Sequence, residues 1–136
     1  MNVIVDTNIL FTALLKENSS MADILINPES EDTFFLPRYA FVELFKHKEK
    51  IIQFTKLSEE NLLETLHLLL KQVQFIDEDM IALQSFIDAH KLVHEIDEKD
   101  LFFVAMTIEL NAYLWTGDKR LIRGLQAKGF HKFYIP

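Results

Sequence analysis

Short apolar runs alternate along the chain with longer segments in which apolar and polar residues recur at helical spacing. The runs "NVIV", "TFFL", "QFI", "AYLWT" and "KFYI" have the aliphatic and aromatic character of buried strands. The longer segments are typical of helices that cover a core on one side. We therefore predict strands over 2–5, 33–36, 74–76, 112–116 and 132–135. We predict helices over 9–16, 20–26, 38–55, 58–73, 78–92, 98–111 and 118–128, with Ser58 as the N-cap of the fourth.

Strands that alternate with helices indicate a parallel sheet covered by helices on both faces. The chain has 136 residues, of which 49% are hydrophobic and twelve are Phe, so it can bury a substantial core. Its three Gly and three Pro residues do not cluster into a linker. We expect an α/β protein, a three-layer α/β/α fold with a central parallel sheet, in one domain over residues 1–136.

The composition argues against several classes of protein. A formal net charge of −7 disfavours a protein that holds nucleic acid by overall positive charge, although it permits a local basic rim. Without Cys, the chain has neither disulfides nor thiolate chemistry. No apolar run reaches the length of a membrane span, and the first residues lack the features of a signal peptide. We expect a cytoplasmic protein that makes no use of a membrane.

Acidic residues stand at the ends of several predicted elements. Asp6 follows the first strand, Glu43 lies in the first turns of the helix after the second strand, and Asp118 follows "YLWTG". Asp97 and Asp100 open the helix that contains "LFFVAM". In parallel sheets ligands bind beyond the carboxyl ends of the strands, where we expect all these segments to emerge. Their carboxylates would then form one site.

Each acid also has a purely structural interpretation. Asp6 and Asp118 are placed to cap helices, and Asp97 with Asp100 has the spacing of an N-cap and its third helical position. Glu43 in "YAFVELF" is expected either to point outward past the apolar stripe or to be buried with a partner. These local explanations do not account for repelling charges at the ends of successive elements. A divalent cation would compensate that repulsion.

Carboxylates around a hard cation are typical of metal-dependent phosphoryl transfer. Mg²⁺ or Mn²⁺, one or two per site, can lower the pKa of a bound water and stabilise the leaving oxygen. The sequence therefore predicts a phosphodiester substrate.

The segments "VIVDTNIL", "FVELFK", "DEKDLFFVAMTIEL" and "YLWTGDKRL" occur in the order and approximate spacing of a PIN domain. From Val3 to the last strand, the chain resembles single-domain prokaryotic PIN proteins, the group that includes VapC-type toxins of toxin–antitoxin pairs. The resemblance implies a small α/β/α fold and metal-dependent endoribonuclease activity. It implies catalytic, metal-binding acids at Asp6, Glu43, Asp100 and Asp118.

The same resemblance implies two supporting residues and leaves one ligand ambiguous. Thr116 would hydrogen-bond a carboxylate or a metal-bound water, and Asn8 would orient Asp6; otherwise Asn8 is a helix cap and Thr116 an ordinary strand residue. Many family members carry one strong acid where this chain offers Asp97 and Asp100. We rank Asp100 first because it directly precedes the apolar helix, whereas Asp97 either ligates a second metal or only caps.

An RNA substrate would need a positive rim around this negative centre. The candidates are basic residues beside Glu43 and Asp118, although basic residues on helices most often form ordinary solvated faces. They are Lys46, Lys48, Lys119, Arg120 and Arg123. The five His residues show no metal-ligand spacing.

The toxin resemblance also implies partners: a homodimer and an antitoxin protein whose C-terminal segment covers the active-site groove. The abundant Phe and Leu of the helices between Tyr39 and Leu70 could supply an apolar seat for that segment. Stand-alone PIN proteins also exist, so the partner is a weaker expectation than the nuclease.

Two other classes compete with the nuclease. A haloacid-dehalogenase-type phosphatase also begins with an acid after a strand, but it needs a second Asp two residues on, where this chain has Asn8. A catalytically silent PIN-like RNA-binding or interaction module is the stronger alternative, and the presence of all four acids argues against it.

Overall fold

The core of the molecule is a parallel sheet with the strand order β3-β2-β1-β4. The computed structural model describes residues 1–15, 20–55 and 58–136. The strands are β1 (Asn2–Val5), β2 (Thr33–Pro37), β3 (Val73–Ile76) and β4 (Tyr113–Trp115). In the centre of the sheet, Val3 of β1 pairs with Phe34 of β2 on one side and with Tyr113 of β4 on the other.

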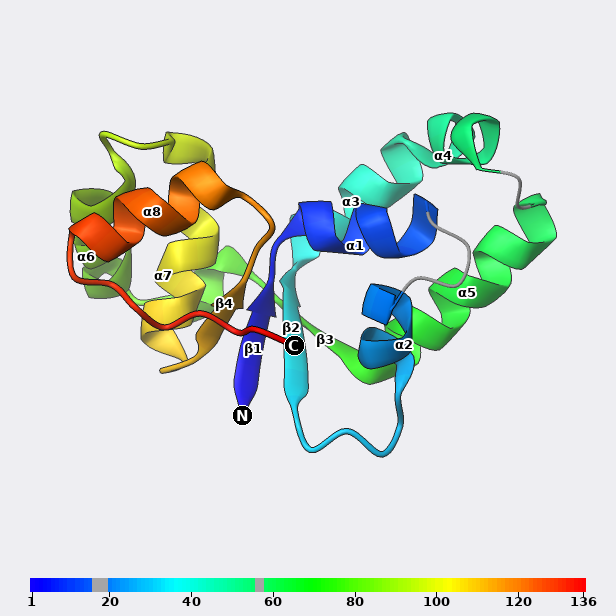
Figure 1. Ribbon diagram of the computed structural model, residues 1–136, viewed down its shortest axis with the longest axis horizontal. Coiled ribbons are helices and arrows are strands. Elements are labelled where there is room, and N and C mark those ends of the chain that lie inside the picture. Colours follow the sequence, from blue (N-terminus) through cyan, green and yellow to red (C-terminus); the bar gives the residue numbers. More distant parts are fainter. Residues whose placement is uncertain (16–19, 56–57) are drawn as a thin grey trace.

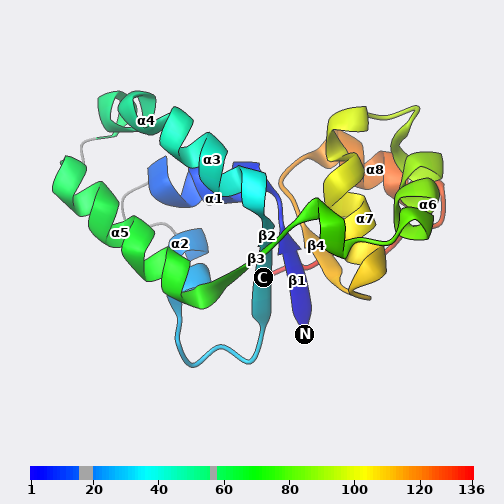
Figure 2. The same cartoon turned by 180° about the vertical axis from the view of Figure 1, so that it is seen from behind.

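Helices cover both faces of the sheet and make three layers (Figure 1). One side carries α1 (Thr7–Leu15), α2 (Ser20–Ile26), α3 (Arg38–Lys46), α4 (Lys48–Phe54) and α5 (Glu59–Gln72). The other side carries α6 (Leu83–Val93), α7 (Leu101–Glu109) and α8 (Lys119–Ala127). Figure 2 shows the same separation from behind. The predicted α/β/α architecture with a central parallel sheet is confirmed.

Alternation along β1 explains why the sheet is buried on both faces. The side chains of Val3 and Val5 belong to the core cluster under α1, α2 and α5, whereas Ile4 belongs to the cluster under α6 and α7. All three residues are 0% exposed. Successive strand residues point to opposite faces, so a continuous apolar run is what a strand between two helical layers requires. Within the described residues, no helix is long and apolar enough to cross a lipid bilayer.

The helix predicted over 38–55 is wrong as a single element, because the chain bends at His47 between α3 and α4. The bend places α4 against α1: the His47 ring lies edge-on to Phe11 with centroids 6.1 Å apart, and Ile51 is buried in the shared core. These contacts stabilise the bent arrangement and not a straight continuation of α3.

Other boundaries differ from the prediction by short segments. The helix predicted over 78–92 begins instead with a 3₁₀ turn, η1 (Glu78–Met80), and α6 starts only after Ala82, whose backbone N–H donates to Glu109 Oε1 at 3.1 Å. The helix predicted over 98–111 begins with a second 3₁₀ turn, η2 (Glu98–Asp100). Helix α1 starts earlier than predicted and ends at Leu15, and residue 16 lies outside the described residues.

The last predicted strand, over 132–135, is reduced to one isolated bridge. Phe133 pairs with Leu114, and the flanking backbone bonds run from Leu114 N to Lys132 O and from Tyr134 N to Leu114 O, both at 2.9 Å. The segment therefore follows β4 without becoming a full strand. The predicted N-cap of α5 is confirmed, since Ser58 accepts a hydrogen bond from the backbone of Asn61.

Candidate active site

Asp6 is fixed at the carboxyl end of β1. Its backbone N–H donates to the carbonyl of Trp115 at 3.0 Å, which continues the pairing of β1 with β4. Its side chain accepts two hydrogen bonds: Oδ2 from the hydroxyl of Thr116 at 2.8 Å and Oδ1 from the backbone of Asn8 at 3.3 Å. Asp6 is only 5% exposed. The carboxylate is thus buried, oriented and paired with neutral donors.

Thr116 connects this carboxylate to the loop that leads into α8. It is 9% exposed, and besides donating to Asp6 its hydroxyl oxygen accepts a hydrogen bond from the backbone N–H of Asp118 at 3.1 Å. One hydroxyl therefore connects the carboxylate of Asp6 to the backbone of Asp118, which is far away in the sequence. This contact is the one that the family resemblance implies for Thr116.

Asp118 is the N-cap of α8, as one of the two interpretations of the sequence had it. Its Oδ1 accepts hydrogen bonds from the backbone of Arg120 at 3.0 Å and of Leu121 at 3.2 Å. Both bonds use the same oxygen, and among the described residues no hydrogen bond engages Oδ2. Capping and a role in the site are therefore compatible in one carboxylate.

Asp97 and Asp100 have different roles in the structure. Asp97 caps η2, because its Oδ1 accepts from the backbone of Lys99 at 3.0 Å. Asp100 occupies the N-cap position of α7, and its side chain makes no capping hydrogen bond. The interpretation in which Asp100 completes a capping arrangement from the third helical position after Asp97 is therefore not supported. Its carboxylate remains free to act in the site.

The charge on Asp100 is opposed by its surroundings. Burial, as the largest cause, and the negative charges of Asp6, Asp97 and Asp118 together raise the pKa of its carboxyl from 3.8 to about 7. Burial and nearby like charges both disfavour ionisation. Asp100 therefore lies within the electrostatic reach of three other acids, and the positive charge of Lys99 opposes their effect without reversing it.

Tyr39 is a member of this site that the sequence analysis missed. Its pKa is raised by burial and then by the charges of Asp6, Asp100, Glu78 and Glu43. Its ring packs edge-on against Phe102 and Phe103 of α7, with centroids 5.6 Å and 6.0 Å away. The available signal was its position four residues before Glu43, because residues at that spacing share one face of a helix.

Glu43 is the least enclosed of the predicted catalytic acids. Its side chain is 41% exposed, and Oε2 lies 3.3 Å from Nε2 of His47, one turn further along. Of the two expectations for Glu43, the outward orientation is therefore observed, with a histidine as its partner. Its charge nevertheless reaches Tyr39.

The acids are neighbours without forming a closed ligand set. Across residues 1–15, 20–55 and 58–136, no three His, Asp or Glu side chains converge closely enough to hold one metal ion. The donor chemistry nonetheless fits a hard divalent cation, because it consists of carboxylate oxygens whose negative charges Lys99 offsets in part. A closed set of metal ligands would require side chains to rotate, above all that of Glu43 away from His47.

The basic residues predicted to form a rim differ in their exposure and in their ion pairs. Lys119, Arg120 and Arg123 are exposed at the start of α8, directly after Asp118. Lys48 is instead bound to Glu59 at 2.7 Å, which ties α4 to α5 and neutralises the lysine charge. The structure therefore favours the α8 group over Lys48, and Lys46 is exposed at the end of α3.

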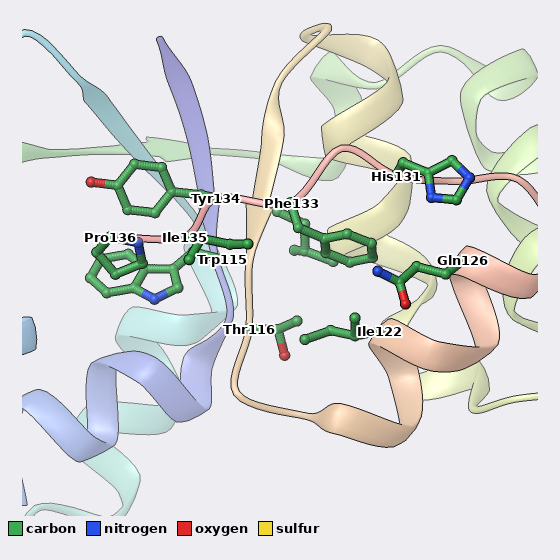
Figure 3. A pocket seen from close by; sticks show the side chains of 10 residues that line it. Trp115, Thr116, Ile122, Gln126, His131, Phe133, Tyr134, Ile135 and Pro136 are labelled. Carbon is green, nitrogen blue, oxygen red and sulfur yellow. The ribbon is translucent and has the colours of Figure 1, made fainter.

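A cavity of about 270 Å³ lies beside the site, under the C-terminal segment (Figure 3). Aromatic residues form much of its wall, and the Trp115 and Tyr134 rings lie 5.2 Å apart. Thr116 lines this cavity, but none of the candidate acids does. Of the candidate acids, Asp118 instead lines a second cavity, of about 360 Å³, between α1 and the loop before α8.

Comparison with known proteins agrees with this geometry. A family model described as PIN domain matches residues 4–134. Among solved structures, the chain is similar to one in the crystal structure of VapBC2 from Rickettsia felis bound to a DNA fragment from their promoter. The TM-score is 0.64 at 22% sequence identity, over 90% of this chain and 92% of that chain, a likeness that shows the fold. Among curated proteins, none matches.

The family match spans nearly all the described elements, from β1 to the segment that pairs with β4. Proteins of this family are generally nucleases. The arrangement of acids at the carboxyl ends of parallel strands agrees with that match, and the chain belongs to the PIN-domain family.

Proposed function

We propose that this protein is a metal-dependent endoribonuclease that cleaves single-stranded or structured RNA. The observation that carries the proposal is the position of Asp100, half-buried, without a capping bond and surrounded by the charges of Asp6, Asp97 and Asp118. A fold does not hold such groups together for stability, because their mutual repulsion is unfavourable. A function that uses their charge explains the arrangement.

Mg²⁺ or Mn²⁺, one or two per site, would supply a polarised water as nucleophile and would neutralise charge on the phosphate. Asp6 would hold the cation in a fixed direction, because Thr116 and the backbone of Asn8 already orient its carboxylate. Asp100 and the free oxygen of Asp118 would complete the inner ligands. Glu43 would join them after leaving His47.

Asn8 supports the site through its backbone in this structure, since its N–H binds Asp6. Tyr39 would border the site on one side, because its ring packs edge-on against Phe102 and the charges of Asp6 and Asp100 act on its hydroxyl. Exposed Lys119, Arg120 and Arg123, with Lys46, would contact the RNA backbone. Such contacts would make binding weaker as the salt concentration rises.

The test is cleavage of single-stranded RNA by the parent and by variants, with Mg²⁺ or Mn²⁺ and with EDTA. Asp6→Asn, Glu43→Gln, Asp100→Asn and Asp118→Asn should each lose about a hundredfold or more in rate, as expected for groups that act as a unit. Asp97→Asn should lose less, because Asn also caps 3₁₀ and α-helical turns well.

A matched control is Asp23→Asn, an exposed Asp on α2, which should leave the rate unchanged. If Asp97→Asn were inactive and Asp100→Asn active, the ranking of those two acids would be reversed. If all variants kept the parent's rate, the acids would have no part in catalysis.

We further propose that the protein is the toxin of a type II toxin–antitoxin pair, acting in the cytoplasm as a homodimer. The similar solved chain comes from a VapBC2 structure, and large apolar side chains of α3 and α4 are exposed, with Val42 at 57%, Phe45 at 50% and Phe54 at 79%. Burial of such residues against a partner would be favourable. Co-expression with the protein from the neighbouring reading frame should abolish RNA cleavage, and Phe54→Asp should weaken that inhibition.

The alternative is a catalytically silent PIN-like RNA-binding or interaction module. The contact between Glu43 and His47 favours it, since that contact holds one acid away from the others. Such a module would bind RNA equally well with Mn²⁺ or EDTA and would not cleave it.

A further inference from the structure

The cavity beside Asp118 has a mixed lining that suits a specific ligand. Its volume is about 360 Å³, and it is lined by Asn8, Ile9, Thr12, Met21, Gly117 and Asp118. That volume falls in the lower part of the range of small-molecule sites, roughly 300–1,000 Å³. The loop from β4 to α8, which carries Asp118, passes beside the first turn of α1 in both views, and the cavity lies between these two segments (Figures 1 and 2).

Gly117 lines this cavity without a side chain. Its backbone does not require glycine, because the described glycine with positive φ is Gly129. A Cβ at position 117 would meet only Cδ1 of Ile9, at 3.9 Å, which is an ordinary contact. Neither backbone conformation nor packing therefore explains glycine here. A side chain at this position would, however, extend toward the space that the cavity occupies.

The lining chemistry is that of a nucleoside site. Ile9 and Met21 give it apolar surface, on which a base can lie. Asn8 is exposed and offers an amide donor and acceptor, and Thr12 donates its hydroxyl hydrogen to Asn8 O at 2.9 Å, which leaves the hydroxyl oxygen as an acceptor. Among the described residues that line the cavity there is no Lys or Arg, so the described lining favours a neutral ligand over a phosphate.

We propose that this cavity holds an unpaired ribonucleoside of the RNA, next to the phosphate that is cleaved, and that Gly117 admits it. The assignment rests on the proposed nuclease function, because only that function places a phosphodiester at Asp6 and Asp118. Single-stranded nucleotides can be turned out of a stack and bound in such pockets through their base edges and 2′-hydroxyl. Double-stranded RNA, whose bases stay stacked, cannot fill the cavity.

The experiment uses neutral ribonucleosides, so that phosphate and metal do not contribute to binding. Adenosine, guanosine, cytidine and uridine are titrated separately into the full-length ¹⁵N-labelled protein in EDTA, and backbone amide shifts are followed. At least one nucleoside should shift Asn8, Thr12 and Gly117. Gly117→Val should weaken that binding by at least about tenfold, because an overfilled site costs this much or more.

Two further variants make the result specific. Ala127→Val introduces the same valine side chain at an exposed position of α8 and should bind like the parent. Thr12→Val keeps the shape and removes the hydroxyl, and should weaken binding less than Gly117→Val. If Gly117→Val does not fold, Gly117→Ala adds a single methyl and should show the same trend. The inference is overturned if no nucleoside shifts these amides, or if Gly117→Val binds as well as the parent.

RNA cleavage by the same samples separates this inference from the proposed function. A parent that cleaves RNA but binds no nucleoside at these amides would refute only the cavity assignment. A parent that binds a nucleoside there, with the predicted loss in Gly117→Val, but cleaves no RNA would refute only the nuclease.

Discussion

Asp100→Asn should make the metal-free protein more stable at pH 8. Burial and the charges of Asp6, Asp97 and Asp118 raise the pKa of Asp100 from 3.8 to about 7. For a carboxyl whose pKa is raised by folding, the stabilising contribution of the protonated form is complete below pH 3.8. It is lost as the pH rises through about 7. Asn carries no charge, so the variant avoids that loss.

The size of the effect follows from the shift. A change from 3.8 to about 7 corresponds to at most about 4.5 kcal/mol, at about 1.4 kcal/mol per pKa unit. Because Asp100 is only partly buried, solvent and salt screen the repulsion, and we expect about 1–2 kcal/mol at pH 8. At pH 5 less than about half of this gain should remain, since the folded carboxyl is then protonated.

Urea unfolding in EDTA at pH 8 and pH 5 measures this gain directly, with Asp23→Asn as the control on an exposed helix face. At about 100 times its dissociation constant, Mn²⁺ should add roughly 2.7 kcal/mol to the parent, and Asp100→Asn should lose most of that. A variant that is less stable than the parent at pH 8, or that keeps the full Mn²⁺ effect, would remove Asp100 from the site.

Three other changes test separate parts of the structure. Thr116→Val removes a hydroxyl that serves two neighbours, so it should lower the free energy of unfolding by about 1–3 kcal/mol in chemical denaturation and slow RNA cleavage. Arg120→Gln should weaken RNA binding and reduce the salt dependence by about one counterion in fluorescence anisotropy, whereas Lys71→Gln, on α5, should change neither. Gly124→Ala should lower the melting temperature, because its Cβ would lie 2.5 Å from Cδ1 of Ile96, and the double variant with Ile96→Ala should recover most of the loss.

The layers of the fold were predictable because they follow from local patterns. Apolar runs such as Val3 to Val5 can be satisfied only between two helical layers, and that is where they lie. The bend at His47 was not predictable, because it depends on Phe11 and on the packing of α4 against α1. The 3₁₀ start at Glu78 likewise depends on Glu109 of α7, 27 residues after Ala82 in the sequence, whose side chain caps α6.

The site was predictable in its members more than in its internal contacts. The strand-end rule placed Asp6 and Asp118 correctly next to one another, and the structure adds the hydroxyl of Thr116 that connects them. Sequence alone could not decide how Glu43 is oriented, because the apolar residues around it are compatible with burial as well as with the exposed contact to His47 that the structure shows. Tyr39 escaped attention because an aromatic residue in an apolar segment is usually part of the core.

The most direct test of the central claim is single-stranded RNA cleavage by the purified parent, followed first in EDTA and then after Mn²⁺ is added in excess. We predict that the parent does not cleave RNA in EDTA and cleaves it rapidly once Mn²⁺ is added. Asp6→Asn should cleave RNA under neither condition, because that variant lacks the carboxylate that the fold orients most firmly. Cleavage by the parent that continues in EDTA, or cleavage by Asp6→Asn at the parent's rate, would contradict the account.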